Sequence, residues 1–474
     1  MLHFRTTPTT VGHFLTSAGC RAVAHATIGC VVVGWMALST SFIQTAHADS
    51  PWPQFRGPGG DGVVADQSVA AKFSEAEDLV WKTDLPGRGW SSPVIADGKV
   101  WVTTAIEIRA SASEIKARMR RSGVKEREMK SRSIAKSIEL RLMAIDFDSG
   151  VIENEIPLEL REDPDAIHSL NSYASPTPVI DGDFIYCHFG TYGTFCVHRD
   201  SGAIQWNHQV DVAHAVGPGS SPLIVGDHLI LILDGCEKQR VVALDKTSGK
   251  VRWETARPEM DAPDGDQKKA FCTPIVITDS RGTEQLICMA SQFIVSLDPV
   301  TGEELWRCRH GRGFSIVPRP VFADDVVYFS TGFGKPELWA VNVTGRGDVT
   351  DSHVRWVQEK GMPKKPSPLV ADGIVYVVAD NGVAVALDAS DGDILWMKRL
   401  GGNYSASPLL VGDAILFASQ EGDVTIIRTG RNFEVMHKTT LSGGIMASPA
   451  VVQGSLIWRT KSALLRFAAA KPQT

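Results

Sequence analysis

The stretch Val241-Val242-Ala243-Leu244-Asp245-Lys246-Thr247-Ser248-Gly249-Lys250-Val251-Arg252-Trp253 decides the fold of this chain. It is typical of two strands joined by a tight turn, with the second strand closed by a Trp. Gly249 supplies a turn residue that can take positive φ. The phrase returns at 294–306 and 383–396, and a degraded copy covers 196–202 with Trp206 following. Such internal repetition predicts a fold built from copies of one unit.

A second marker divides the chain into units. It is a Ser-Pro pair or its equivalent before a short apolar strand and a turn of the Asp-Gly type, and it occurs eight times. Successive markers are 40–52 residues apart, except for a first interval of 83. A spacing of roughly 40–50 residues is typical of one propeller blade. Its Pro residues are Pro93, Pro176, Pro222, Pro274, Pro318 with Pro320, Pro368, Pro408 and Pro449.

Each unit reads as four strands, and together they predict an all-β, eight-bladed β-propeller. A single sheet of this kind has two apolar faces, which radial packing against neighbours buries. The last unit, 448–467, ends after three strands, whereas 79–85 is a strand with no partner in sequence. We therefore predict a single propeller over 79–470, closed by the N-terminal strand and preceded by an arm at 49–78.

One Trp recurs at the end of the repeated phrase. In a repeat fold, equivalent side chains fill the space between neighbouring sheets, so these Trp residues are predicted to be structural. They are Trp81, Trp206, Trp253, Trp306 and Trp396.

The long first interval indicates an insertion. From Arg109 to Arg141 there are 11 Lys or Arg against 4 Glu, with no Pro. We predict a basic helical insertion at 106–140 that leaves the first blade between its second and third strands. It can bind an anionic partner or be a solvated decoration of one rim, and both interpretations remain open.

Composition and the N-terminus indicate export. The 474-residue chain carries a net charge of −6, too mild to imply a nucleic-acid partner. An apolar run and Ala46-His47-Ala48 predict a signal peptide at 1–48, cleaved after Ala48, with an uncleaved membrane anchor as the alternative. No other long apolar run exists, so no transmembrane segment is expected in the mature chain. The predicted location is the periplasm or cell envelope.

The cysteines leave two interpretations open. No C-x-x-C pair is present, which argues against a zinc knuckle or an attached haem. Cys187 and Cys196 flank a tight hairpin and are candidates for a disulfide, and two buried thiols are the alternative.

The pattern Ala-x-Asp-x-x-Thr-Gly-x-x-x-Trp resembles the repeat of PQQ-like, quinoprotein-type β-propellers. Residues 242–253 and 295–306 carry it, and the exported BamB-like subgroup is similar over about 50–470. The resemblance implies a non-catalytic scaffold that binds a protein or other macromolecular partner during outer-membrane assembly. One departure is Asp49, which stands where a lipoprotein of that subgroup would carry its lipid-modified Cys.

Quinoprotein alcohol dehydrogenases also share this repeat, which makes a PQQ-dependent oxidoreductase an alternative function. Those enzymes carry an adjacent Cys pair, a Ca²⁺ site and a catalytic Asp. No two Cys are adjacent here, and no Ca²⁺ loop or other metal site is recognised, so no cofactor is expected, with PQQ and Ca²⁺ as the alternative. No G-x-S-x-G, H-E-x-x-H or P-loop is present, and no catalytic residue is predicted.

The binding site is expected on the loops before the innermost strands, which converge at one end of a propeller's channel. Their aromatic, cationic and amide side chains suit an envelope protein segment or peptide, and a polysaccharide is the alternative. A carbohydrate-binding propeller is thus a third hypothesis. The predicted rim residues are Arg88, Trp90, Asn171, Tyr173, Arg319, Lys364, Lys365, Asn403 and Tyr404.

Overall fold

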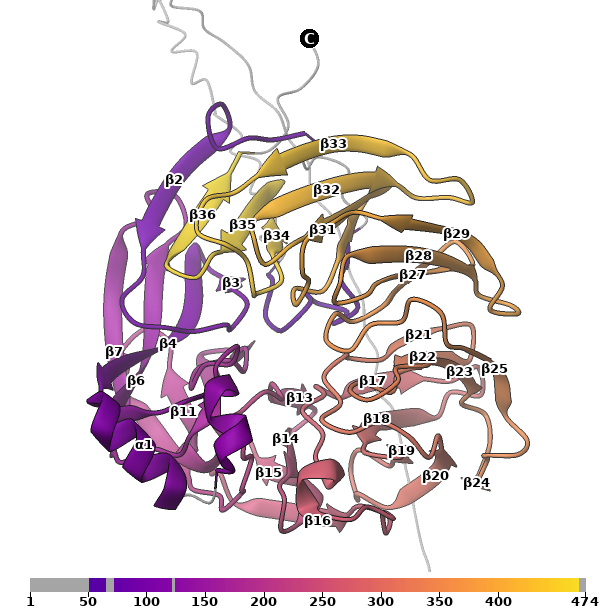
Figure 1. Cartoon of the computed structure of the whole chain (residues 1–474), viewed down its shortest axis with the longest axis horizontal. Coiled ribbons are helices and arrows are strands. Elements are labelled where there is room, and N and C mark those ends of the chain that lie inside the picture. The colour runs from indigo at the N-terminus through magenta and orange to yellow at the C-terminus, as the bar shows by residue number, and fades with distance from the viewer. Residues whose placement is uncertain (1–50, 65–71, 122–123, 469–474) are drawn as a thin grey trace, which may run out of the picture. The chain divides into compact units, whose positions relative to one another are not determined.

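The computed structural model describes residues 51–64, 72–121 and 124–468. The predicted signal peptide, 1–48, lies outside the described residues. The chain divides into two units, Met1–His47 and Ala48–Thr474, and the second contains the whole propeller. Eight sheets follow one another around a ring, and each is an antiparallel meander with its first strand innermost (Figure 1). The predicted eight-bladed propeller is confirmed.

The blades have the following strands, from the innermost outward. Blade 1 holds β3 (Val94–Ala96), β4 (Lys99–Arg109), β6 (Ala135–Asp146) and β7 (Ile152–Glu162). Blade 2 holds β9 (Val179–Asp181), β10 (Phe184–His188), β11 (Thr194–His198) and β12 (Ile204–His208). Blade 3 holds β13 (Leu223–Val225), β14 (His228–Asp234), β15 (Gln239–Asp245) and β16 (Val251–Ala256). Blade 4 holds β17 (Ile275–Thr278), β18 (Glu284–Ala290), β19 (Phe293–Leu297) and β20 (Glu304–Arg309), with β24 (Gly347–Asp348) added in parallel.

Blade 5 holds β21 (Val321–Ala323), β22 (Val326–Ser330), β23 (Leu338–Asn342) and β25 (Val354–Gln358). Blade 6 holds β26 (Leu369–Ala371), β27 (Ile374–Val378), β28 (Val383–Asp388) and β29 (Ile394–Arg399). Blade 7 holds β30 (Leu409–Val411), β31 (Ala414–Ala418), β32 (Asp423–Arg428) and β33 (Val435–Thr440). Blade 8 holds β34 (Ala450–Val452), β35 (Ser455–Arg459), β36 (Ala463–Phe467) and β2 (Leu79–Asp84).

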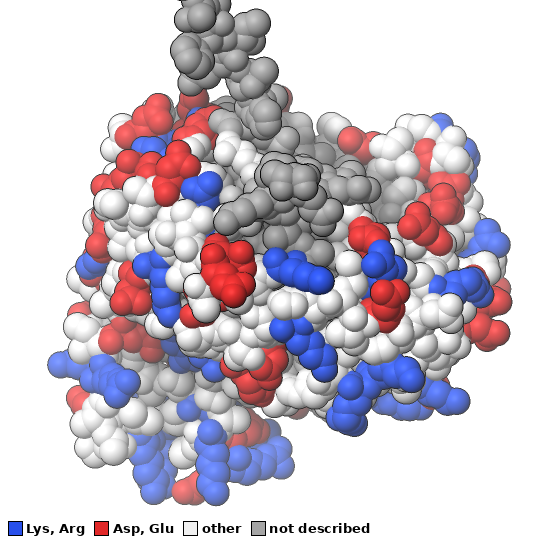
Figure 2. Space-filling view, turned by 90° about the horizontal axis from the view of Figure 1, so that it is seen from above, with Lys and Arg blue, Asp and Glu red and all other residues white. Residues whose placement is uncertain are grey.

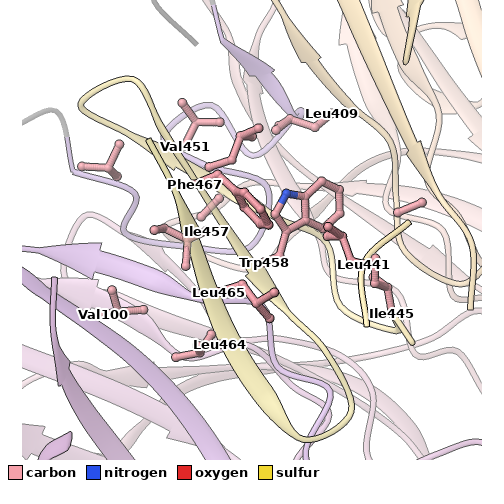
Figure 3. Packing of buried hydrophobic residues seen from close by; sticks show 14 of the residues in the cluster. Val100, Leu409, Leu441, Ile445, Val451, Ile457, Trp458, Leu464, Leu465 and Phe467 are labelled. Carbon is pink, nitrogen blue, oxygen red and sulfur yellow. The ribbon is translucent and has the colours of Figure 1, made fainter. Parts of the chain in front are cut away.

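The N-terminal strand closes the ring, as the sequence predicts. β2 pairs antiparallel with β36, so the outermost strand of blade 8 comes from the start of the propeller. The core beside this joint is fully buried, with Trp458, Leu464 and Phe467 packed between the sheets (Figure 3). Burying such large apolar side chains makes the closure a major source of stability.

The recurrent Trp residues lie at the blade junctions. The indole N–H of Trp81 donates to Phe147 O at 2.9 Å, and a Cβ built on Gly150 would lie 2.6 Å from its ring. Trp206 and Gly249 repeat this arrangement two blades further on, at the junction of blades 2 and 3. The turn Gly is therefore required twice, for positive φ and for close approach of the ring. Trp253 and Trp396 also lie in outermost strands, whereas Trp306 donates inside its own blade, to Gln285 Oε1 at 2.7 Å.

The insertion in blade 1 is shorter and less helical than expected. Within 106–140, residues 106–109 and 135–140 are strand, because β4 and β6 continue their ladder outward. The rest contains α1 (Ala112–Arg121), the 3₁₀ turn η1 (Glu126–Ser131) and β5 (Arg132–Ser133). β5 pairs with β8 (Ile167–His168) from the connection to blade 2. We call residues 110–121 and 124–134 the basic insertion.

Cys187 and Cys196 are free thiols, which corrects the proposed disulfide. In the β10–β11 ladder Cys187 lies opposite Phe195 and Cys196 opposite Tyr186. This register, one residue away from direct pairing, places the two thiols in different core clusters on opposite faces of the sheet. The shorter helices are η2 (Gly190–Tyr192) and η3 (Gly265–Lys268), and no helix among the described residues is long and apolar enough to cross a membrane.

Candidate functional site

The N-terminal arm crosses the centre of the ring. Trp52 exchanges two backbone hydrogen bonds of 2.8 Å with Ile95 of β3, and Pro53 O accepts from Ile180 N of β9 at 2.8 Å. Further on, β1 (Val63–Val64) pairs in parallel with β30. The arm therefore joins the inner strands of blades 1, 2 and 7 and occupies the channel on the side where these strands end.

Arg319 fixes the middle of the arm. Its guanidinium donates to Phe55 O at 2.7 Å and to Pro274 O at 2.9 and 3.1 Å. It is 2% exposed and lies against Gly60, so it is not the rim residue that the sequence predicted. Arg56 of the arm donates to Pro368 O at 2.8 Å. Burial lowers the pKa of Arg56 to about 9 and that of Arg319 to about 10, which leaves both charged at neutral pH.

A ring of hydroxyl groups explains the Ser-Pro marker. At six of the eight junctions the backbone N–H of the marker residue donates to the hydroxyl of the next blade's marker, as Ser92 N does to Thr177 Oγ1 at 2.9 Å. In blade 2 this residue is Thr177 of Thr177-Pro178, directly before β9, which corrects the predicted Ser175-Pro176 marker by two residues. Five other junctions repeat the bond at 2.9–3.0 Å. Arg319 stands where the fifth blade would supply such a hydroxyl. The marker residues therefore form hydrogen bonds that link neighbouring blades.

A cavity of about 580 Å³ opens at the other end of the channel. Its walls are the loops before the innermost strands and the loops after the second strands, and Phe55 contributes from the arm. The floor carries the marker hydroxyls. The apolar and aromatic residues that line it are Trp90, Leu170, Val216, Pro218, Phe271, Phe314, Val317, Phe333 and Met446.

Of the nine predicted rim residues, four line this cavity: Trp90, Asn171, Lys364 and Lys365. Arg88 lies beside it, with its guanidinium 5.2 Å from the centre of the Trp90 ring, and Asn403 is exposed and bound to Glu421. Tyr173 and Tyr404 are buried at 0% and 1% exposure and pack beneath the loops. Tyr173 donates its hydroxyl to Asp165 O at 2.8 Å.

The cations at the mouth are only partly neutralised. Asp380 accepts from Lys364 N at 2.6 Å and lies 3.3 Å from the ammonium of Lys365. His168 lines the cavity with Nδ1 accepting from Leu170 N at 3.1 Å. Burial lowers the pKa of His168, and Arg132 and Lys365 lower it further. Positive charge therefore faces this mouth from two sides of the ring.

Four phenylalanines of the cavity were not among the nine predicted rim residues: Phe55, Phe271, Phe314 and Phe333. Phe271 precedes the Thr273-Pro274 marker, so the marker rule itself could have found it. Phe333 follows β22, on a loop that reaches the same end of the channel. Phe55 had no such signal, because the Gly- and Pro-rich arm has no strand pattern that would place it.

The cavity does not offer the donor set that a quinone with Ca²⁺ requires. Its carboxylates, Asp266 and Asp380, are each paired with a Lys, and no group of three His, Cys, Asp or Glu among residues 51–64, 72–121 and 124–468 is arranged for a metal. Hard cations need several converging oxygen ligands. The apolar walls and the Lys–Asp pairs of the cavity thus do not fit PQQ with a bound Ca²⁺.

The fold and the site define a propeller of quinoprotein-type repeats with a cavity at one end of its channel. The family model described as outer membrane protein assembly factor BamB matches residues 58–255 and 290–439, and the chain belongs to this family. No curated protein matches the chain.

Solved structures with the same fold include a BamB protein and dehydrogenases. BamB from Moraxella catarrhalis is 16% identical, with 82% of this chain and 99% of that chain covered and a TM-score of 0.55. A europium-containing methanol dehydrogenase is 10% identical, with 87% and 90% covered and a TM-score of 0.62. Quinohemoprotein alcohol dehydrogenase from Comamonas testosteroni is 13% identical, with 90% and 82% covered and a TM-score of 0.60. At these identities the likeness is one of fold alone.

Proposed function

We propose that this protein is an exported, non-catalytic propeller of the periplasm or cell envelope that binds a protein partner at the cavity end of its channel. The observation that carries the proposal is the cavity itself. It is concave and mainly apolar, has aromatic walls, and carries a few polar groups. Pockets of this composition bind side chains or ligands by burial of apolar surface.

Membership of the BamB family supports a protein partner. The carbohydrate alternative loses support, because Tyr173 and Tyr404, two of the three aromatic residues that suggested it, are buried. Only the fold supports the oxidoreductase alternative, because the carboxylates of the cavity are paired with Lys.

Site-specific photo-crosslinking in cells tests the proposal. A photoreactive residue at Leu170, which is 49% exposed and lines the cavity, is expected to form a discrete adduct with one protein. The adduct is expected to weaken in a Trp90→Ala background. The matched control is the same residue at Val300, which is 65% exposed in a turn at the other end of the propeller. Equal adducts from both positions, or none from Leu170, would contradict the proposal.

A further inference from the structure

The basic insertion lies at the mouth of the cavity. β5 pairs with β8, so Arg132 lies opposite His168, and Ser169 N donates to Ser131 O at 2.8 Å. His168 and Leu170 of the same segment line the cavity. The insertion and one wall of the cavity are therefore a continuous piece of structure.

The insertion is anchored rather than loosely attached. Ser111 and Glu114 form a capping box at the start of α1, with bonds of 2.7 and 3.3 Å. Arg118 is buried, donates to Ala135 O at 2.6 Å and lies 3.0 Å from Asp163. Met119 is buried against Ile134 and Ala166, with Ile115 packed on the same cluster. This anchoring holds the opposite side of the helix at a fixed place beside the mouth.

The outward side of the insertion carries unneutralised positive charge. Residues 110–134 include eight Lys or Arg and three Glu, a local charge of +5 in a chain of net charge −6. Lys116, Lys125 and Lys130 are exposed and make no ion pair with any described residue. Blue side chains gather at the lower left of Figure 2, on the side where Figure 1 draws α1.

Helix electrostatics do not account for these three Lys residues. Cations in the last turn of a helix stabilise it through the helix dipole, which suits Arg120 and Arg121. Lys116 lies in the middle of α1, and Lys125 and Lys130 lie beyond its end. Their charge therefore remains available to a partner.

We propose that the basic insertion and the cavity form one binding site for an acidic protein segment. An apolar side chain of the segment fills the cavity, and carboxylates that flank it pair with Lys116, Lys125 and Lys130. This inference rests on the proposed function and adds the chemistry of the partner. Complementary charge at the rim of an interface raises the rate of association and excludes partners of the wrong charge.

An anionic membrane is the competing occupant, and the structure favours the protein segment. A helix that binds a membrane surface keeps its apolar face free for the lipid. Here the apolar residues of α1, Ile115 and Met119, are already packed in a cluster with Ile134 of the insertion and Ala166 of the connection to blade 2. A concave cavity of about 580 Å³ also suits a projecting side chain better than a flat surface.

Fluorescence anisotropy on the full chain tests the inference. The probe is a labelled peptide of Glu and Asp around one central Trp, compared with its Gln and Asn counterpart. We expect the acidic peptide to bind at least about tenfold more tightly than the neutral one, with the difference shrinking as salt rises. Lys116→Glu with Lys125→Glu and Lys130→Glu is expected to remove that preference.

The matched control reverses three exposed cations on the outermost strands and their turns, Lys250→Glu, Arg355→Glu and Lys398→Glu, and is expected to keep the preference. Equal binding of the two peptides, with both weakened by Trp90→Ala, would overturn the acidic specificity and leave the proposed function standing. Binding of neither peptide, together with binding to phosphatidylglycerol vesicles that the insertion variant loses, would overturn the inference in favour of a membrane.

Discussion

At one end of the central channel the arm from Trp52 to Val64 is bound by backbone pairing and by two buried Arg residues, whereas the other end is an apolar cavity. The backbone of the arm is hydrogen-bonded to the propeller: Trp52 pairs with Ile95, Phe55 O accepts from Arg319, and β1 pairs with β30. The cavity exposes aromatic surface, and the ammonium of Lys364 has no ion pair with any described residue. The comparison teaches that one end is structural and that the other is the end available to a partner.

The largest effect is expected from a matched pair of Trp residues, one at each end. Trp52 is 2% exposed and packs in the core cluster beside the closing blade, so Trp52→Ala is expected to lower the free energy of unfolding by about 3–5 kcal/mol. Trp90 is half-buried and donates one hydrogen bond to Leu170 O, so Trp90→Ala is expected to cost only about 1 kcal/mol.

Urea unfolding of both variants measures the difference. Binding is expected to follow the opposite order, with Trp90→Ala losing the partner and folded Trp52→Ala retaining it. Similar stability losses in the two variants would remove the distinction between the two ends.

Acid is expected to act through a His at the cavity end. His214 is buried against Phe271, its two ring nitrogens have no hydrogen-bond partner among the described residues, and burial lowers its pKa to about 4. The unfolded chain, with an ordinary His pKa of 6.5, takes up a proton first as pH falls. Stability is therefore lost between about pH 6.5 and 4, by up to about 3 kcal/mol from this group.

We expect His214→Leu to reduce the loss of stability between about pH 6.5 and 4, measured as the urea midpoint of unfolding at each pH. A change of stability at neutral pH does not alter this expectation. His188, whose pKa burial lowers to about 3, remains and keeps part of the slope. An unchanged slope in the variant would show that His214 is not the group that titrates.

A smaller effect is expected from two Gly residues of similar backbone conformation. Gly60 has φ 69° and Gly98 has φ 71°. A Cβ on Gly60 would lie 2.4 Å from Nη1 of Arg319, whereas a Cβ on Gly98 would meet nothing within 4 Å. Gly98→Ala thus reports the cost of positive φ alone, about 1–2 kcal/mol, and Gly60→Ala is expected to cost roughly 1–3 kcal/mol more. Thermal unfolding compares them, and equal losses would show that the contact between the arm and Arg319 adds nothing.

Repetition made the fold predictable from the sequence. The marker at each blade and the unpaired strand with Trp81 were sufficient to predict the ring and its closure. Trp356 also belongs to the junction Trp residues, because it contacts Gly392 of the next blade. The sequence did not predict it, since β24 and its turn lengthen the last hairpin of blade 5 and change the spacing of the repeated phrase. Of the two alternatives for Cys187 and Cys196, the buried thiols are confirmed and the disulfide was wrong, because the position of a hairpin does not fix its register to one residue.

The site was predictable only in part. The loops before the innermost strands do meet at one end, and four of the nine predicted residues line the cavity. The sequence did not show which of these side chains are buried. Tyr173 and Tyr404 lie beneath the loops, and Arg319 is buried below the cavity, where it binds the arm. The arm has no periodic pattern, so its path through the channel could be seen only in three dimensions.

Hydrogen exchange of the full chain, with and without the acidic peptide probe, tests the central claim most directly. We predict slower exchange at 168–171, 314–317 and in the basic insertion, and unchanged exchange at 60–64, the part of the arm beyond Phe55. Slowing confined to 51–64, or no change at the mouth at a peptide concentration that saturates anisotropy, would contradict the assignment of the cavity end as the binding end.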